Sequence, residues 1–242
     1  MLSLSKNKIK WIRSLQQKKF REELGLFIVE GEKMVSEALD YCKNDIQFLC
    51  CTKDSTISLD NHNFETALAT DEELTSISSL KNPNKSLVIL KIPLKKEIKT
   101  EFRIALDGIQ DPGNMGTILR LADWFDVKEI ICSNDTVDIY NPKVVQASMG
   151  AIFRINVIYC DLAEYLSRSK EPIYGALLEG ENIYKKTIAP KGTLILGNEG
   201  NGISQKVITL VNQPITIPRF GKAESLNVSV ATGILLSEFF RT

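Results

Sequence analysis

Histidine is almost absent from this sequence. His62 is the single histidine among 242 residues, and it lies in a polar stretch, residues 60–63. Catalytic triads that use histidine, and metal sites built on histidine, are therefore excluded from the second part of the chain, residues 102–242.

Paired cysteine motifs are missing as well. The five cysteines form no C-x-x-C motif, and an odd number cannot all pair within one chain: Cys42, Cys50, Cys51, Cys132 and Cys160. Neither a disulfide framework nor a zinc site is indicated, and we expect no bound metal. This cysteine usage fits a reducing compartment, so we expect a cytoplasmic protein.

Long hydrophobic runs are also absent. No uncharged apolar stretch reaches the about 18 residues that a membrane-spanning helix needs, so we expect no such helix. The basic N-terminus is not followed by an apolar run, so we expect no signal peptide.

Acidic residues are missing from residues 6–21, although the net charge of the chain is zero. Apolar residues recur there at helical spacing, and residues 1 to 22 are predicted to form a basic helix. Two interpretations stay open, a solvated basic arm or a contact surface for the phosphates of a nucleic acid. The basic residues are Lys6, Lys8, Lys10, Arg13, Lys18, Lys19 and Arg21.

The chain is long enough for two domains. Residues 1–92 alternate short strands and helices, which predicts a small α/β domain. Residues 93–101 are charged and begin with a proline, and we interpret them as a linker. Residues 102–242 alternate apolar strands with helices, which predicts an α/β domain with a mostly parallel sheet flanked by helices. The last predicted helix spans residues 224–240.

Three polar loops that contain glycine follow predicted strands of the second domain. They span residues 107–117, 196–204 and 217–227. In an open parallel sheet, loops at the carboxyl ends of strands converge on the ligand, and glycine lets the backbone approach it closely. Neither G-x-G-x-x-G nor a P-loop is present, which disfavours a nucleotide-dependent oxidoreductase and a P-loop nucleotidase.

Two charged side chains beside these loops have both a structural and a functional interpretation. Glu199 either caps a helix or faces a ligand site. Arg120 lies about 200° around its helix from Ile118, which belongs to the buried stripe, so it is either a surface arginine or directed toward the loops. In the second case its guanidinium would suit a phosphate or a developing oxyanion.

Several motifs occur in these loops in a defined order. They are Asn114-x-Gly116-x-x-x-Arg120, Leu196-Gly197-Asn198-Glu199-Gly200, Ile217-Pro218 and Glu224-Ser225-Leu226-Asn227-Val228, with Ser148-Met149-Gly150-Ala151 as a further segment. From about residue 102 to residue 241 the chain resembles the SpoU/TrmH-type RNA 2'-O-ribose methyltransferases of the SPOUT superfamily. Residues 1–92 are similar, more weakly, to the small substrate-binding domain of that family.

The resemblance implies a fold and ligands that the residue spacing does not show. The family threads its C-terminal part through a loop as a trefoil knot, an exception to the rule that protein chains are not knotted. It also implies S-adenosylmethionine as cofactor, structured RNA as partner, and a homodimer built on the last helix.

The resemblance also implies roles for individual residues. Arg120 would be the catalytic residue, and Asn114, Glu199, Ser225 and Asn227 would position it, the ribose and the cofactor. The cofactor would be bound by Leu196, Gly197, Asn198, Gly200, Ile217, Pro218 and Leu226. Because arginine stays protonated in proteins, we interpret Arg120 as an electrostatic stabiliser of the developing alkoxide and not as a base.

Two positions depart from the family pattern. Asp126 stands where glycine is common, and Arg219 stands where many members have methionine. Alternatives stay open at this stage: a non-catalytic RNA-binding homologue, methylation of a base or a protein on the same fold, and transfer RNA in place of ribosomal RNA as the substrate.

Overall fold

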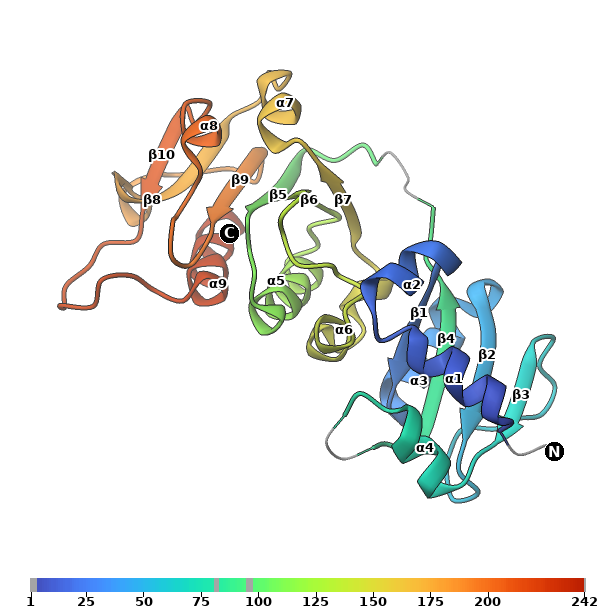
Figure 1. Cartoon of the computed structure of the whole chain (residues 1–242). Helices are drawn as coiled ribbons and strands as arrows, with labels where there is room; N and C mark the ends of the chain where they lie inside the picture. Colours follow the sequence, from blue (N-terminus) through green and yellow to red (C-terminus); the bar gives the residue numbers. More distant parts are fainter. Residues whose placement is uncertain (1–3, 81–82, 95–97, 242) are drawn as a thin grey trace. The chain divides into compact units, whose positions relative to one another are not determined.

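The computed structural model describes residues 4–80, 83–94 and 98–241. These residues form two compact units, whose elements are labelled in Figure 1. Unit 1 comprises the described residues up to Leu94 together with Asp138–Phe153, and unit 2 comprises those from residue 98 to Val137 and from Arg154 onward. The predicted linker, residues 93–101, includes residues 95–97, which lie outside the described residues.

Unit 1 contains a mixed sheet. Its four strands within the described residues have the order β1-β4-β2-β3. Strand β4 pairs antiparallel with β1 and β2, whereas β3 pairs parallel with β2. Alternate side chains point to opposite faces, so the strands contribute to two hydrophobic cores. The strands are β1 (Leu26–Glu30), β2 (Ile46–Cys51), β3 (Glu65–Leu68) and β4 (Ser86–Lys91).

Helices cover both faces of the unit 1 sheet. One face packs against α1 (Lys6–Ser14) and α4 (Asp71–Ile77), and the other packs against α3 (Glu32–Tyr41). The second face also takes in Val145 of α6 (Pro142–Ser148) and Ile152 of the short helix η2 (Ala151–Phe153). A short helix η1 (Lys43–Asp45) precedes β2.

The basic N-terminal stretch forms two helices and not one. After α1 the chain turns, and α2 (Lys18–Leu24) ends at Gly25, whose φ of 63° is in the left-handed region that favours glycine. Residues 1–3 of the predicted helix lie outside the described residues.

Unit 2 contains a parallel sheet, as the alternation of strands and helices predicts. Six strands within its described residues have the order β10-β8-β9-β5-β6-β7, and every pair in this sheet is parallel. They are β5 (Phe102–Asp107), β6 (Glu129–Ser133), β7 (Asn156–Cys160), β8 (Ile173–Asn182), β9 (Gly192–Gly197) and β10 (Gln213–Thr216). The predicted α/β fold with a mostly parallel sheet flanked by helices is confirmed. The trefoil knot stays a prediction.

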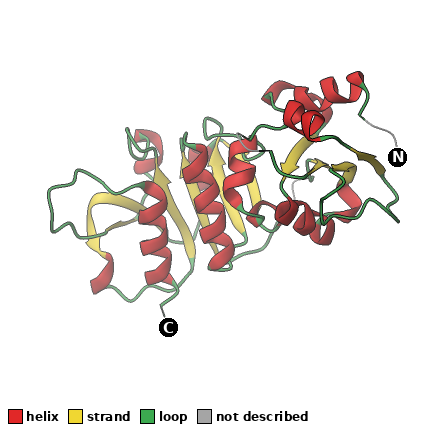
Figure 2. Cartoon of the chain, turned by 90° about the horizontal axis from the view of Figure 1, so that it is seen from below, coloured by secondary structure: helices red, strands yellow, loops and turns green. Residues whose placement is uncertain are grey.

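Two long helices lie side by side in unit 2, as the view in Figure 2 shows. They are α5 (Pro112–Trp124) and α9 (Val228–Phe239), and α9 also contacts β9. Phe239 of α9 packs against Phe102 and Tyr174, which fixes the C-terminal end of this helix on the sheet. The apolar side chains of α7 (Leu162–Ser167) and α8 (Gln205–Ile208) form a separate core with β5, β6, β8 and β9, and η3 (Ile183–Lys185) follows β8.

The last helix is shorter than predicted. It begins at Val228, whereas the prediction began it at Glu224. Asn227 has a non-helical ψ of 137° and its side chain accepts hydrogen bonds from the backbone N–H groups of Ser229 and Val230, so it caps the helix. Glu224, Ser225 and Leu226 therefore belong to the preceding loop.

Strand β8 is long, and its last residues shape unit 2. It runs from Ile173 to Asn182. After a bulge between Pro214 and Ile215, β10 pairs again with β8 through Ile215 and Thr216. This second pairing holds the extended part of β8 beside the loop that follows β10.

Candidate active site

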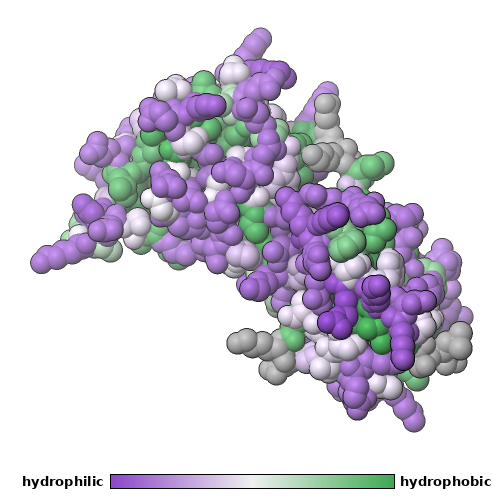
Figure 3. Space-filling view, in the orientation of Figure 1, coloured by the Kyte–Doolittle hydropathy of each residue, from purple (hydrophilic) through white to green (hydrophobic). Residues whose placement is uncertain are grey.

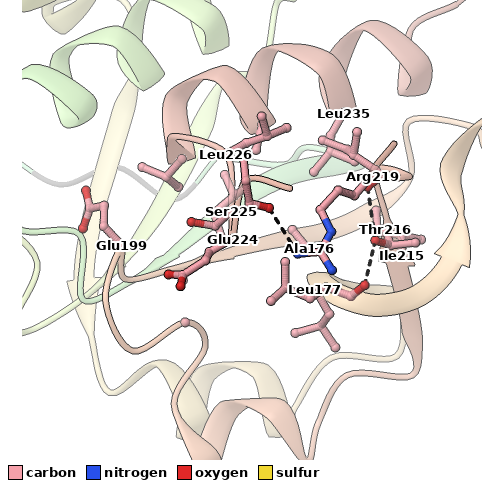
Figure 4. A pocket seen from close by; sticks show the side chains of 18 of the residues that line it. Ala176, Leu177, Glu199, Ile215, Thr216, Arg219, Glu224, Ser225, Leu226 and Leu235 are labelled. Carbon is pink, nitrogen blue, oxygen red and sulfur yellow. Dashed lines mark hydrogen bonds between the residues drawn. The ribbon is translucent and has the colours of Figure 1, made fainter. Parts of the chain in front are cut away.

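A cavity of about 570 Å³ lies in unit 2 beside the ends of β8, β9 and β10. Figure 4 shows its wall from close by, with α9 on one side and the loop after β10 on another. A volume of this size is typical of small-molecule and cofactor sites. The seven predicted cofactor-binding residues all line it: Leu196, Gly197, Asn198, Gly200, Ile217, Pro218 and Leu226.

The loop after β9 forms a rigid wall of the cavity. Asn198 and Gly202 exchange backbone hydrogen bonds, each of 2.9 Å, and the Asn198 side-chain oxygen accepts from the backbone N–H groups of Gly200 and Asn201. The Asn198 amide nitrogen donates to the carbonyl oxygen of Gly108 in the loop after β5. Asn198 therefore holds two loops together, so its side chain is engaged within the protein.

Gly197 is required by close packing of the same loop. A Cβ atom at this position would lie 2.2 Å from the backbone carbon of Gly202 and 2.3 Å from the nitrogen of Ile203. Gly202 itself has a φ of +67°. The turn that presents Glu199 thus depends on glycine at two positions for two different reasons.

The loop after β10 differs from the loop after β9. Residues 217–226 form no backbone-to-backbone hydrogen bond with any described residue, and residues 219–227 are exposed. Side chains donate to the carbonyl oxygens of Ile217 and Ala223, and the other backbone polar groups of this loop are available to a ligand in the cavity. Apolar side chains complete the wall, among them Ile217 and Leu235.

Three side chains from the three predicted loops are joined by hydrogen bonds. The Asn227 amide nitrogen donates to the Asn114 side-chain oxygen at 2.9 Å, and the Asn114 amide nitrogen donates to a Glu199 carboxylate oxygen at 2.8 Å. We call these three side chains, Asn227, Asn114 and Glu199, the relay. The Asn227 oxygen already accepts from the backbone at the start of α9, so the Asn227 amide nitrogen must be the donor to Asn114, and the Asn114 amide nitrogen the donor to Glu199. An aspartate at position 114 would instead place a carboxylate against Glu199.

Residues 101–237 match the sequence profile described as the SpoU rRNA Methylase family. The chain belongs to this family. Residues 6–87 match a second profile, the MRM3-like substrate binding domain. The SpoU match covers the whole cavity and the relay, so the described site lies within the region that defines the family.

Relatives resemble this SpoU methylase chain over nearly its full length. The 23S rRNA (guanosine(2553)-2'-O)-methyltransferase RlmP of Bacillus subtilis is 27% identical over 239 residues, which cover 97% of this chain and 96% of that protein. A structure of a TrmH-family protein from Porphyromonas gingivalis, described as a putative RNA methyltransferase, has a TM-score of 0.88 and 36% identity, with 98% of each chain covered. An AdoMet-bound rRNA methyltransferase structure from Sinorhizobium meliloti has a TM-score of 0.84 and 27% identity, over 99% and 97% of the two chains.

The predicted catalytic residues of the SpoU region fall into three groups. Glu199 and Ser225 line the cavity, and Asn114 and Asn227 are connected to it through the relay. Arg120 does not line the cavity. It is exposed on α5 and forms no hydrogen bond or ion pair with the residues that the structure describes.

Several lining residues were missed by the sequence analysis. Ala176, Leu177 and Leu178 of β8 and Ala231 and Leu235 of α9 all contribute to the wall. All five lie within a strand or a helix, whereas the sequence analysis placed the site in the polar loops that follow the strands. A regular strand carries no polar loop signal that would mark it in the sequence.

S-adenosylmethionine fits the residues of this cavity. Its adenine ring would suit the apolar wall that Leu178, Ile217 and Leu235 provide, and its polar edges would suit the free backbone groups of residues 217–226. Glu199, Glu224 and Arg219 add two carboxylates and a guanidinium to the lining.

The basic N-terminal stretch belongs to unit 1 and is only partly free to contact phosphates. Arg21 is 3% exposed, with an ion pair of 2.5 Å to Asp138 and hydrogen bonds to the carbonyl oxygens of Leu15 and Gln16. Lys8 pairs with Glu65. Five basic side chains of the stretch are exposed, namely Lys6, Lys10, Arg13, Lys18 and Lys19.

The surface offers little that points to another site. Hydrophilic side chains dominate the face in Figure 3, with small hydrophobic patches between them. His62 stacks on Phe64 and contacts the carbonyl oxygen of Ser58 in unit 1. Among the described residues, no group of three or more His, Cys, Asp or Glu side chains is arranged to hold a metal ion, and no helix is long and apolar enough to cross a membrane.

Proposed function

We propose that this chain transfers a methyl group from S-adenosylmethionine to a ribose 2'-hydroxyl of structured RNA, with ribosomal RNA favoured over transfer RNA. The name of the Bacillus subtilis relative supports this choice of substrate and acceptor, because the two chains match over almost their whole lengths. The AdoMet in the Sinorhizobium meliloti structure supports the cofactor.

The observation that carries the proposal is the relay beside the cavity. Asn227, Asn114 and Glu199 come from three separate loops and meet at the rim of a cavity of cofactor size. When bound, S-adenosylmethionine supplies a methyl group on a sulfonium leaving group. The task of the protein is then to place a hydroxyl oxygen in line with that methyl group and to stabilise its developing negative charge.

Each residue of the relay has a positioning role in this proposal. Glu199 lies in the cavity wall with one relay bond from Asn114, so its second oxygen can accept a hydrogen bond from the ribose or the cofactor. Ser225 lies in the same wall and can donate or accept. Leu196, Gly197, Ile217, Pro218, Leu226 and Gly200 would contact the cofactor, largely through backbone atoms.

Arg120 would hold an RNA phosphate and stabilise the alkoxide. It is one helical turn from Trp124, which is 84% exposed, on the same helix that packs against α9. On α9, Val230 is 51% exposed. A homodimer built on α5 and α9 would cover such exposed apolar side chains, and we expect Arg120 to act at the dimer interface. Leu226, at 49% exposed, would be covered by the partner or by the cofactor.

The remaining parts of the chain complete the proposal. Residues 1–92 would bind the RNA substrate, residues 93–101 would link the domains, and residues 102–242 would carry the reaction. The exposed basic side chains of α1 and α2 would contact RNA phosphates. None of the five cysteines forms a disulfide with a described residue, and the cysteine usage fits the expected cytoplasmic location.

Transfer of labelled methyl groups tests the proposal. Purified protein is incubated with S-adenosylmethionine labelled in the methyl group and with separated ribosomal and transfer RNA pools, and the modified nucleotide is then mapped. Incorporation at a ribose 2'-hydroxyl of ribosomal RNA is expected. No incorporation into any RNA would favour the alternative that the chain is a non-catalytic RNA-binding homologue. Label on a base would show that the methyl acceptor is a base and not a ribose hydroxyl.

Substitution of Arg120 tests its role in the same assay. Arg120→Ala should lower methyl transfer by about 10²- to 10³-fold, because a donor for the developing charge is lost. Binding of S-adenosylhomocysteine and the dimer mass should stay unchanged, as calorimetry and light scattering would show. Full turnover by this variant would remove Arg120 from the mechanism.

A further inference from the structure

Arg219 is the one cationic side chain among the described residues that line the cavity of unit 2. It follows Ile217 and Pro218 in the loop after β10, at a position where the resembling family often has methionine. Its Nη1 donates a hydrogen bond of 3.1 Å to the carbonyl oxygen of Ala223. This bond folds the loop back on itself and keeps the guanidinium turned toward Ala176 and Leu177, as Figure 4 shows.

Most of the hydrogen-bonding capacity of this guanidinium is unused. Arginine has five N–H donors, and Ala223 is the acceptor for one of them. No other hydrogen bond or ion pair joins Arg219 to the described residues. A planar group with free donors inside a cavity matches a carboxylate, which can accept two parallel bonds from it.

The other charges of the cavity restrict where an anionic group can bind. Two carboxylate side chains, Glu199 and Glu224, line the same cavity. They attract the sulfonium and ammonium groups of S-adenosylmethionine and repel its carboxylate. Among the described residues that line the cavity, Arg219 is therefore the side chain that would stabilise this carboxylate.

We propose that Arg219 binds the carboxylate of the amino-acid end of the cofactor and thereby selects the intact cofactor over fragments that lack this group. The inference rests on the proposed function, since it assigns one more contact within the same site. Arg219 is exposed, but its bond to Ala223 turns the guanidinium toward Ala176 and Leu177 of the cavity wall, which favours the cofactor carboxylate over a phosphate of the RNA substrate as its partner.

Binding of two ligands by the full chain tests this assignment. S-adenosylhomocysteine carries the amino-acid carboxylate, and 5'-methylthioadenosine has the same adenosine part without it. Calorimetric titration would give the affinity of each ligand for the wild type, for Arg219→Met and for Arg219→Lys. Lys222→Met is the matched control, because Lys222 lies in the same loop but is not among the cavity-lining residues.

Arg219→Met should lower the affinity for S-adenosylhomocysteine by about 10- to 100-fold, the loss expected for a hydrogen-bonded charge pair. Its affinity for 5'-methylthioadenosine should stay within about 2-fold of the wild type, a change smaller than one ordinary hydrogen bond. The affinity of Arg219→Lys for S-adenosylhomocysteine should lie between those of the wild type and Arg219→Met, because lysine keeps the positive charge but lacks the planar guanidinium. Lys222→Met should change neither affinity.

Three outcomes would overturn the inference. Equal losses for both ligands would mean that Arg219 only braces the loop, and no loss for either would remove it from the site. Weaker RNA binding with unchanged S-adenosylhomocysteine affinity would assign it to an RNA phosphate. If the wild type bound neither ligand, the cofactor assigned under the proposed function would be wrong, and this inference would fail with it. The first three outcomes would not affect the proposed function.

Discussion

Carboxylates that follow buried strands behave differently in the two units. In unit 1, Glu30 accepts hydrogen bonds from the Ser78 hydroxyl and from the backbone and side chain of Ser79. Glu32 accepts from the Ser55 hydroxyl and from the backbone and side chain of Thr56. Each of these carboxylates accepts three hydrogen bonds from nearby loops, so it stabilises the scaffold.

In unit 2, Glu199 has a single described donor, the amide of Asn114, and it lies in a cavity wall. The same chemical group is therefore held by three donors at Glu30 and Glu32 of unit 1 and by one donor at Glu199 of unit 2. A carboxylate whose lone pairs are filled within the protein is part of the fold, whereas one with a free oxygen beside a cavity can bind a ligand.

Removing the geometry that presents Glu199 should have the largest effect. In Gly197→Ala the new Cβ would overlap the backbone at Gly202 and displace the loop. We expect about a 100-fold loss of methyl transfer and a clear loss of S-adenosylhomocysteine affinity. Gly200→Ala is the matched control, because its Cβ would meet only the Asn198 side-chain oxygen, at 3.5 Å. Equal effects of the two substitutions would contradict the close-packing explanation.

Removing one carboxylate from each unit should separate activity from stability. Glu199→Ala should lower methyl transfer roughly 10-fold or more through loss of positioning, with a small change in thermal stability. Glu30→Ala should lower the free energy of unfolding by about 1–3 kcal/mol, because the buried carboxylate and its hydrogen bonds to Ser78 and Ser79 are lost. Rate assays and denaturant titrations of both variants measure the two effects. An equally large loss of methyl-transfer rate in Glu30→Ala and Glu199→Ala would contradict the difference between the two carboxylates.

The smallest expected effect concerns pH. The hydrogen bond from the backbone N–H of Thr56, with those from the Ser55 and Thr56 hydroxyls, holds the pKa of Glu32 below its ordinary value. A carboxylate with a lowered pKa in the folded state stabilises the protein above the unfolded pKa of about 4.3, and this stabilisation is lost as the pH falls through the folded value. The wild type should therefore exceed Glu32→Gln in stability at pH 7, and melting curves should show the gap shrinking below pH 4. A gap that did not depend on pH would point to lost packing instead.

Much of unit 2 could be predicted from local sequence. Apolar strands that alternate with amphipathic helices predict a parallel sheet, because each strand must be covered on both faces. The polar loops that follow those strands were expected to converge, and the seven predicted cofactor-binding residues do line one cavity. Glycine-rich and polar loops are recognisable because regular elements exclude such residues.

Other features depend on partners that are distant in the sequence. Arg21 belongs to a basic run, but its burial is decided by Asp138, which lies 117 residues away. Residues 138–153 lie between two strands of the parallel sheet in sequence, yet they pack with unit 1. The start of α9 at Val228 follows from the cap that Asn227 provides, and this residue is also held by Asn114.

The sequence by itself determined the α/β class, the order of the strands and helices, and the loops that carry the site, because these follow from hydrophobic periodicity and from the backbone freedom of glycine. Tertiary structure alone decided which polar groups are paired and which are free. Asn114 meets Glu199 across 85 residues and Asn227 across 113, and only the folded sheet brings their loops together. Whether a carboxylate or a guanidinium serves the scaffold or a ligand depends on the number of internal partners that the fold supplies, and local sequence does not encode that number.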